Sequence, residues 1–362
     1  MLEKMKFIDL DSSHKKIERK IKINFSKIFK HKKFILGPEV VDLEKNLSNY
    51  TKSKAVCVSS GTDALLLAMM ALNIGRGDEV ITTPFTWGSN SEMIKFLGAK
   101  PVYVDINEKN FNINPDLIKK RITKKTKAIM TVNLFGQCCD YSEIRKNING
   151  KKIYIIEDAA QSFGAKYKDK FSCNLGDISC TSFFPSKPLG SYGDGGACFT
   201  NNKKLLKKIK MIRNHGQIKK NHHNIMGHNA RMDSIQAVII NLKLNIFEEE
   251  KNLRQIVAKR YDNLLKNKRN IIQIPSIEKF NLSIYAQYTL RVKNRKNIIE
   301  KFKKNKIPYN IFYPIPLYKQ KAFLDKSYKL KNVEKIVSEV ISIPFHPYLK
   351  YKEQKIISEL FN

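Results

Sequence analysis

The chain has 362 residues, of which 42% are hydrophobic, and its 67 lysines and arginines against 33 acids give a formal net charge of +34. This length and apolar content predict a globular protein with a large core and exclude a disordered chain. The longest apolar stretches, such as residues 64–72, are too short to cross a bilayer, and the first residues lack the apolar region of a signal peptide. We therefore expect a cytoplasmic protein with no membrane partner.

The positive charge raises the alternative of a basic nucleic-acid-binding regulatory protein. The lysines are spread along the whole chain, in which isoleucine and asparagine are also abundant, as in a general compositional bias. There is no aromatic RNA-binding motif, zinc finger or sustained basic helix. We therefore expect solvated surface lysines and no nucleic-acid partner, although a positive field would help to attract a polyanionic small substrate.

The six cysteines show neither a CxxC pair nor the spacing of a zinc site, and most lie in apolar runs. They are Cys57, Cys138, Cys139, Cys173, Cys180 and Cys198. This pattern predicts reduced core residues and no metal, as in a reducing compartment.

Strand-like runs alternate with helical patterns from about residue 54 to residue 200. The predicted strands are 55–59, 78–84, 100–105, 128–136, 152–158, 178–184 and 196–200, and the clearest helical patterns are 62–74 and 90–98. Continuous β-branched runs separated by helices are typical of a parallel sheet that is covered on both faces. The fold class is therefore α/β, with a mostly parallel sheet.

A second, smaller region follows a long helical pattern. Residues 233–267 predict one long helix that leads out of the first domain, and the remainder mixes strands at 286–292 and 341–347 with a helix at 297–304. We therefore divide the chain into an N-terminal arm with a large domain, residues 1–250, and a small α+β domain, residues 251–362.

Ligands in open α/β sheets bind beyond the carboxyl ends of the strands, and four features fall at such positions. The first is the turn Ser59-Ser60-Gly61-Thr62 before a helix. The free N–H groups and dipole of a helix N-terminus form a phosphate site, to which Thr62 adds a hydroxyl. Ordinary helix capping explains the same residues.

The second and third features are an acid and an aromatic ring. Asp158 ends the run "IYIIED", and a buried carboxylate needs a positive partner, such as a protonated pyridine nitrogen, or hydrogen bonds. Capping of a helix is the alternative role. Trp87, the only tryptophan, follows the strand in "PFTWGSN", where its ring can stack on a flat cofactor or simply pack.

The fourth feature is Lys187, in "SFFPSKPLGSYGDGGA", where a run of β-formers ends in a lysine beside a proline and passes into a glycine-rich loop. A desolvated lysine in a cleft becomes a Schiff-base nucleophile, whereas an exposed one is a surface lysine among many. Phosphate site, stacking ring, acid and amine together are what pyridoxal 5'-phosphate requires.

The chain resembles the sugar aminotransferases of the DegT/DnrJ/EryC1/StrS family, which share the type I fold of pyridoxal-phosphate-dependent aminotransferases. The resemblance runs nearly end to end, through "FILGPEVVDLEKNL", "GTDAL", "GDEVITTPFTW", "EDAAQSFGA", "FFPSKPLGSYGDGGA", "GHNARMDSIQA" and "FYPIPLYKQKAF". It implies an aminotransferase that uses pyridoxal phosphate.

The resemblance implies roles for individual residues. Lys187 is the Schiff-base lysine and proton shuttle, and Asp158 pairs with the pyridine nitrogen. Gln161, one helical turn later, approaches the ring hydroxyl, and Trp87 stacks on the ring. The residues implied to hold the phosphate are Gly61, Thr62, Ser182 and, from the other subunit, Asn229. The active unit is therefore expected to be a homodimer with a shared site.

The motifs "TSFFPSKPLG", "LKLNIFEEE" and "YPIPL" look most like the members that aminate UDP-2-acetamido-2-deoxy-3-oxo-glucuronate for bacterial surface polysaccharides such as O-antigen. The implied amino donor is L-glutamate, and a 4-keto nucleotide sugar is the alternative acceptor. Arg231, His222 and His223 are candidates to meet the charges of the UDP-sugar, with a solvated loop as the other interpretation of the two histidines.

Two positions depart from the family pattern. Relatives usually carry histidine where this chain has Phe312, and often threonine where it has Asn90. Neither position belongs to the predicted cofactor set. We therefore expect both departures to affect the identity of the substrate rather than the type of reaction.

Overall fold

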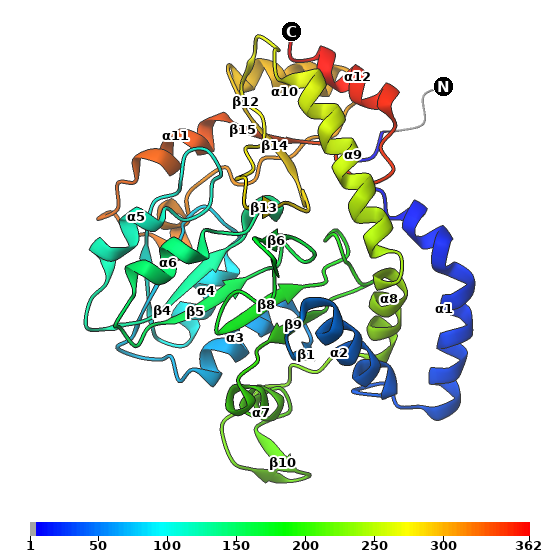
Figure 1. Ribbon diagram of the computed structural model, residues 1–362, viewed down its shortest axis with the longest axis vertical. Helices are drawn as coiled ribbons and strands as arrows, with labels where there is room; N and C mark the ends of the chain where they lie inside the picture. Colours follow the sequence, from blue (N-terminus) through cyan, green and yellow to red (C-terminus); the bar gives the residue numbers. More distant parts are fainter. Residues whose placement is uncertain (1–4) are drawn as a thin grey trace.

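The computed structural model describes residues 5–362, and a seven-stranded sheet forms its centre (Figure 1). In sheet order the strands are β1 (Ala55–Val58), β9 (Gly196–Phe199), β8 (Ile178–Ser182), β5 (Tyr154–Asp158), β4 (Thr126–Val132), β2 (Glu79–Thr82) and β3 (Lys100–Tyr103). Only β9 pairs antiparallel with its neighbours within this sheet. The predicted α/β class with a mostly parallel sheet is confirmed.

Helices cover both faces of this sheet, as continuous apolar strands require. On one face lie α3 (Gly61–Ala71), α4 (Ser89–Phe96) and α7 (Lys203–Ile212). On the other lie α2 (Pro38–Thr51), α5 (Pro115–Ile118), α6 (Tyr141–Asn147) and α8 (Ser234–Leu244). The N-terminal helix α1 (Asp11–His31) packs on the outside of α8 (Figure 1).

The prediction of one long helix over residues 233–267 is wrong, because α8 ends at Leu244 and a separate helix, α9, spans Phe247–Leu265. The chain turns at Ile246, whose ψ of 1° is far from the helical value. Three glutamates, Glu248 to Glu250, occupy the first turn of α9, where the helix dipole favours negative charge. The break lets α8 stay on the sheet while α9 continues into the C-terminal part (Figure 1).

The C-terminal part is built around a three-stranded antiparallel sheet. Its elements are β12 (Ile271–Gln273), β14 (Tyr288–Val292), α10 (Arg295–Lys304), α11 (Lys331–Glu339), β15 (Val340–Ile343) and α12 (Tyr351–Glu359). Apolar residues of α9, α10 and α12 pack with β14 and β15 in one core cluster. The predicted strands and helix of this region are confirmed. The proposed boundary at residue 250 falls inside α9 and stays a prediction.

Short elements complete the chain. They are β6 (Lys166–Tyr167), β7 (Lys170–Phe171), β13 (Asn281–Leu282), β10 (Gln217–Lys219), β11 (His222–His223), and the 3₁₀ turns η1 (Lys119–Arg121), η2 (Leu134–Gly136), η3 (Leu317–Lys319) and η4 (Lys321–Phe323). The hairpin β10–β11 projects from the body at the lower end of Figure 1.

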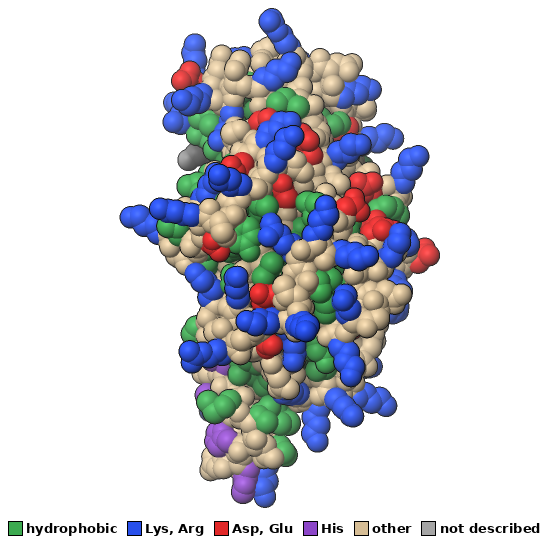
Figure 2. Space-filling model, turned by 90° about the vertical axis from the view of Figure 1, so that its left-hand side faces the viewer, with side chains coloured by type: hydrophobic (Ala, Val, Ile, Leu, Met, Phe, Trp, Pro, Cys, Tyr) green, Lys and Arg blue, Asp and Glu red, His purple; other side chains and the backbone are tan. Residues whose placement is uncertain are grey.

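The surface and the cysteines agree with expectation. Lysines and arginines are scattered over the face in Figure 2 rather than gathered in one patch, and histidines gather at its lower end. All six cysteines are buried and free. No helix in the described part of the chain is both long and apolar enough to cross a membrane.

Candidate active site

A cavity of about 380 Å³ opens where β4, β5 and β8 end. This is the edge at which an α/β sheet binds its ligands. Seven of the predicted site residues line it, and they are Gly61, Thr62, Trp87, Asp158, Gln161, Ser182 and Lys187. The structure therefore brings together residues that are spread over more than a third of the chain.

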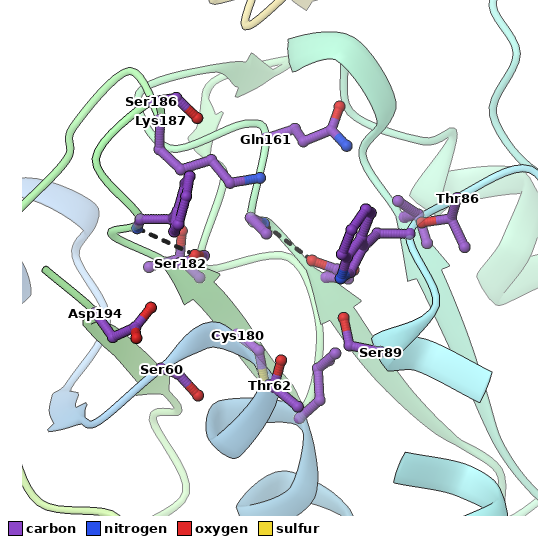
Figure 3. Close-up of a pocket in the computed structure, with 18 of the residues that line it drawn as sticks. Ser60, Thr62, Thr86, Ser89, Gln161, Cys180, Ser182, Ser186, Lys187 and Asp194 are labelled. Carbon is purple, nitrogen blue, oxygen red and sulfur yellow. Dashed lines mark hydrogen bonds between the residues drawn. The ribbon is translucent and has the colours of Figure 1, made fainter. Parts of the chain in front are cut away.

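Lys187 reaches this cavity from a tight turn. Strand β8 ends at Ser182, and the Lys187 N–H donates to the Phe184 carbonyl at 2.8 Å. The predicted strand 178–184 is therefore two residues too long, and Lys187 lies five residues beyond the end of β8. A side chain on Gly190 would lie 2.5 Å from the Pro185 carbonyl oxygen, so glycine is required to close this turn. Figure 3 shows the Lys187 amine pointing into the cavity.

Asp158, the last residue of β5, is only 7% exposed and presents both carboxylate oxygens to donors. Oδ1 accepts from the Ala160 N–H and Oδ2 from the Asn90 amide, each at 3.0 Å. A turn rather than a helix follows, so Asp158 does not cap a helix. For the same reason Gln161 follows it in a turn, and not one helical turn later as expected.

Burial governs the electrostatics of the acid and the amine. Burial raises the pKa of Asp158, whereas hydrogen bonds from Ala160 and Asn90 and the charge of Lys187 lower it. Burial also lowers the pKa of Lys187, against the opposing charge of Asp158. Lowering the pKa enlarges the neutral fraction of the amine, and only the neutral amine is a nucleophile or a proton acceptor.

The other end of the cavity is suited to a phosphate. Ser60 caps α3: its hydroxyl accepts from the Asp63 N–H and its carbonyl from the Ala64 N–H, both at 3.0 Å. The two earlier N–H groups, of Gly61 and Thr62, have no acceptor within the helix. Figure 3 shows Ser60, Thr62 and Ser182 on the same side of the cavity.

Glycine at position 61 brings α3 close to strand β8. A Cβ atom on Gly61 would lie 2.6 Å from the Ser182 Cβ, which is closer than carbon atoms can approach. The first turn of α3 and the Ser182 hydroxyl therefore flank one small space. Two free N–H groups with the hydroxyls of Thr62 and Ser182 form a suitable anion site. These residues fit the phosphate of pyridoxal phosphate.

Tyr313 is a cavity residue that the sequence reasoning missed. Its hydroxyl accepts from Gln161 Nε2 at 3.1 Å, while Gln161 Oε1 accepts from the Phe135 N–H at 2.8 Å. Both ends of the Gln161 amide are thus held. The motif "FYPIPL", which contains Tyr313, was the available signal.

Asn90 is the second missed residue, and the expectation that it stands apart from the cofactor set is wrong. It lies at the start of α4, is fully buried and donates to Asp158. No local signal in the sequence points to this contact, because Asp158 lies 68 positions away along the chain. Phe312 is placed differently, with its ring beside Phe7 and Tyr313.

Four predicted residues do not line the cavity of their own chain. His222 and His223 are exposed on β11. Asn229 pairs with Asn214 in an isolated bridge, and Arg231 donates to the Asn214 side chain at 3.3 Å. His222 and His223 belong to the projecting hairpin β10–β11, whereas Asn229 and Arg231 both contact Asn214, which precedes that hairpin in the sequence.

An amine on a turn, a buried acid and an anion site at one edge of a mostly parallel sheet are the arrangement of pyridoxal-phosphate-dependent aminotransferases. Sequence comparison agrees, and the family model described as "DegT/DnrJ/EryC1/StrS aminotransferase family" matches residues 15–361. The chain belongs to this family, and pyridoxal phosphate is its cofactor.

Individual relatives resemble the chain over almost its whole length. It is 48% identical to the UDP-2-acetamido-2-deoxy-3-oxo-D-glucuronate aminotransferase of Pseudomonas aeruginosa, over 98% of each chain. A DegT/DnrJ/EryC1/StrS aminotransferase from Brucella abortus is 34% identical, with a TM-score of 0.93 over 99% of this chain and 98% of that one. NtdA from Bacillus subtilis, solved with bound cofactor PMP, is 30% identical, with a TM-score of 0.92 over 100% of this chain and 85% of that one.

Proposed function

We propose that the protein transfers the amino group of L-glutamate to the 3-keto carbon of UDP-2-acetamido-2-deoxy-3-oxo-D-glucuronate. The observation that carries this proposal is the 48% identity, over 98% of both chains, to the P. aeruginosa enzyme of that name. The cavity supports the reaction type, because Lys187, Asp158 and the anion site all border it.

When bound, pyridoxal phosphate supplies an aldehyde for the amino group and a ring that accepts the electron pair released on deprotonation. Lys187 provides the amine that holds this aldehyde between turnovers. Once displaced by the amino donor, its neutral Nζ atom would accept the proton from the carbon that bears the amino group and pass it to the cofactor carbon within the same half-reaction. In the second half, Nζ would move a proton the other way, from the cofactor carbon to the sugar carbon. The lowered pKa of Lys187 favours this role.

Other residues orient the cofactor and exclude water. Asp158 would present a negative charge to the protonated ring nitrogen, and Trp87 would cover the ring. Gly61, Thr62 and Ser182 would hold the phosphate. Gln161 faces the ring hydroxyl, with its amide held by the contacts to Phe135 and Tyr313.

The direct test uses the proposed product, UDP-2-acetamido-3-amino-glucuronate, without a keto acid. We expect it to replace the absorption band of bound pyridoxal phosphate with that of the pyridoxamine form. Lys187→Ala should bind the cofactor yet fail to convert it. A wild-type band that this compound leaves unchanged, but that a 4-amino nucleotide sugar converts, would reject the C3 uronate in favour of a 4-keto substrate.

We also propose a homodimer whose active sites are shared. Among the cavity-lining residues of the described chain, only Lys187 is cationic, whereas the proposed substrate carries a diphosphate and a carboxylate. Asn229, Arg231, His222 and His223 lie near the projecting hairpin, from which a partner subunit can supply an amide and positive charge.

Mixed dimers test this arrangement. We expect Lys187→Ala and Asn229→Ala chains to be poorly active alone. Because half of the randomly mixed dimers are hetero-dimers, and each of these has one intact site, mixing should restore about a quarter of wild-type activity. No restoration in verified mixed dimers would reject the shared site.

We place this activity in the cytoplasm, in the synthesis of nucleotide sugars for a bacterial surface polysaccharide such as O-antigen. The six buried free thiols suit a reducing compartment. The +34 charge is then a scattered surface feature that favours the approach of a polyanionic sugar nucleotide, rather than a nucleic-acid site.

A further inference from the structure

We propose that Asn90 is a positioning residue that holds the Asp158 carboxylate in the ionised form and orientation that receive the cofactor ring nitrogen. The inference rests on the proposed function, because it assumes that pyridoxal phosphate binds against Asp158. Asn90 does not line the cavity itself. It acts through Asp158, to which its side chain donates a hydrogen bond.

The contacts of the Asn90 side chain fix its amide as a donor. Nδ2 donates to Asp158 Oδ2 at 3.0 Å and approaches the Met130 sulfur at 3.1 Å. Both neighbours are acceptors, so the opposite orientation of the amide would place its oxygen against the carboxylate. Asn90 Oδ1 is buried and has no hydrogen-bond partner among residues 5–362. In this arrangement the amide oxygen makes no hydrogen bond to the described chain, while the NH₂ group donates to Asp158.

The two oxygens of Asp158 each face a group that can only donate. Ala160 N–H points at Oδ1 and the Asn90 amide at Oδ2. A proton on either oxygen would compete with one of these donors, so the pair favours the carboxylate over the neutral acid. Burial acts in the opposite direction and raises the pKa of Asp158. Asn90 therefore offsets part of the effect of burial.

Other titratable groups also face Asp158. Lys187 favours its charge. Burial raises the pKa of Tyr313 and of Cys180, and the charge of Asp158 adds to this effect. Lys187, however, reacts with the cofactor and is then no longer a free ammonium. Ala160 and Asn90 remain as the fixed donors. Of these two only Asn90 acts through its side chain, so only its contribution can be removed by substitution.

The experiment compares three variants. Asn90→Leu replaces the amide by an apolar group of similar shape, and Asn90→Asp keeps the shape but introduces a second acid. Ser91→Ala is the matched control, because Ser91 is buried on the same helix and its hydroxyl bonds to the Tyr103 hydroxyl at 2.9 Å, away from Asp158. Pyridoxal phosphate affinity is measured for each by titrating the cofactor-free protein.

We expect Asn90→Leu to weaken cofactor binding about tenfold to a hundredfold, the usual effect of losing a hydrogen bond to a charged group. The ¹³C resonance of the Asp158 carboxyl, followed without cofactor, should titrate at a higher pH than in the wild type. Ser91→Ala should change neither quantity. Asn90→Asp should bind well at low pH, where the added acid is protonated and donates, and worse as the pH rises and the two carboxylates repel.

Three results would overturn the inference. One is a folded Asn90→Leu variant with wild-type affinity and wild-type Asp158 titration. The second is a Ser91→Ala variant that loses as much affinity as Asn90→Leu, which would indicate general loosening of α4. The third is a pH-independent affinity of Asn90→Asp, which remains informative if Asn90→Leu does not fold. Failure of the wild type to bind pyridoxal phosphate would instead reject the proposed function together with this inference.

Discussion

The active-site amine and acid acquire their chemistry from burial more than from their residue types. A lysine in water is protonated at neutral pH. Lys187 differs because its turn carries it into a cavity where desolvation lowers its pKa. Asp158 lies in the same cavity, and its two donors preserve the charge that burial opposes.

The hydroxyl of Tyr313 lies in the cavity wall and holds the Gln161 side chain. We expect Tyr313→Phe to lower kcat/KM about tenfold, because Gln161 Nε2 loses its buried acceptor and the hydroxyl disappears from the cavity wall. The ring remains to pack edge-on against Phe85, so the unfolding temperature should change little. Steady-state kinetics and a thermal melt measure both quantities.

Tyr309→Phe is the matched control for this variant. Tyr309 lies four residues away and its ring packs on Phe302, in the C-terminal core. It should keep wild-type kinetics. Equal kinetics for Tyr313→Phe and the wild type would show that the hydroxyl has no part in catalysis or binding.

At the scale of the element, β5 carries two adjacent acids with different roles. Side chains alternate across a strand, so Asp158 faces the cavity while Glu157 faces away from it. Glu157 is fully buried and its two oxygens accept five hydrogen bonds. The donors are Asn133 Nδ2 at 2.8 Å, Ser172 Oγ at 2.8 Å, Cys173 N at 3.0 Å, Leu175 N at 3.0 Å and Ser179 Oγ at 2.6 Å. Glu157 thus ties β5 to β8, to the loop after β4 and to the loop before β8.

Removing this acid should destabilise the protein strongly. We expect Glu157→Leu to lower the free energy of unfolding by about 3–5 kcal/mol, because five buried donors lose their acceptor. Urea denaturation provides the measurement. Glu143→Gln is the control. The side chain of Glu143 pairs with Lys146 at 3.5 Å in an exposed position, so this change should alter stability by less than about 0.5 kcal/mol. Similar losses for the two variants would contradict this account of Glu157.

At the scale of the whole molecule, His346 lies where three distant segments meet. It follows β15 in the C-terminal part, and its surrounding charges are Asp9 and Lys6 near the N-terminus and Arg254 on α9. Burial lowers its pKa to about 4, and within the described part of the chain its Nδ1 has no hydrogen-bond partner. This histidine therefore stays neutral in the folded chain at pH values where the unfolded chain binds a proton.

The sign of the resulting pH dependence follows from this difference. Between pH 6.5 and about 4 the unfolded state binds more protons, so acidification through this window should lower the free energy of unfolding, by about 3 kcal/mol in total. In His346→Leu the free energy of unfolding should depend less steeply on pH in this window, because only the contributions of the carboxylates remain. Urea denaturation at a series of pH values measures the difference between the two proteins. Identical slopes would show that His346 titrates normally in the folded state.

The sequence by itself determined the fold class, the cofactor and seven of the residues that line the cavity. These residues lie in short local motifs: Lys187 precedes a glycine-rich loop, Asp158 ends an apolar run, and Gly61 and Thr62 begin a helix. Short motifs of this kind predict the local backbone. The motifs come together because the carboxyl ends of neighbouring parallel strands lie at the same edge of the sheet.

Only the tertiary structure showed which other residues hold the predicted cavity residues in place. Asn90 contacts Asp158 across 68 positions, and Tyr313 contacts Gln161 across 152. Local periodicity cannot determine such contacts, because they depend on the order of the strands and on how the C-terminal part packs on the sheet. The break between α8 and α9 has the same origin, since both segments are helical by pattern and only packing on two different cores separates them.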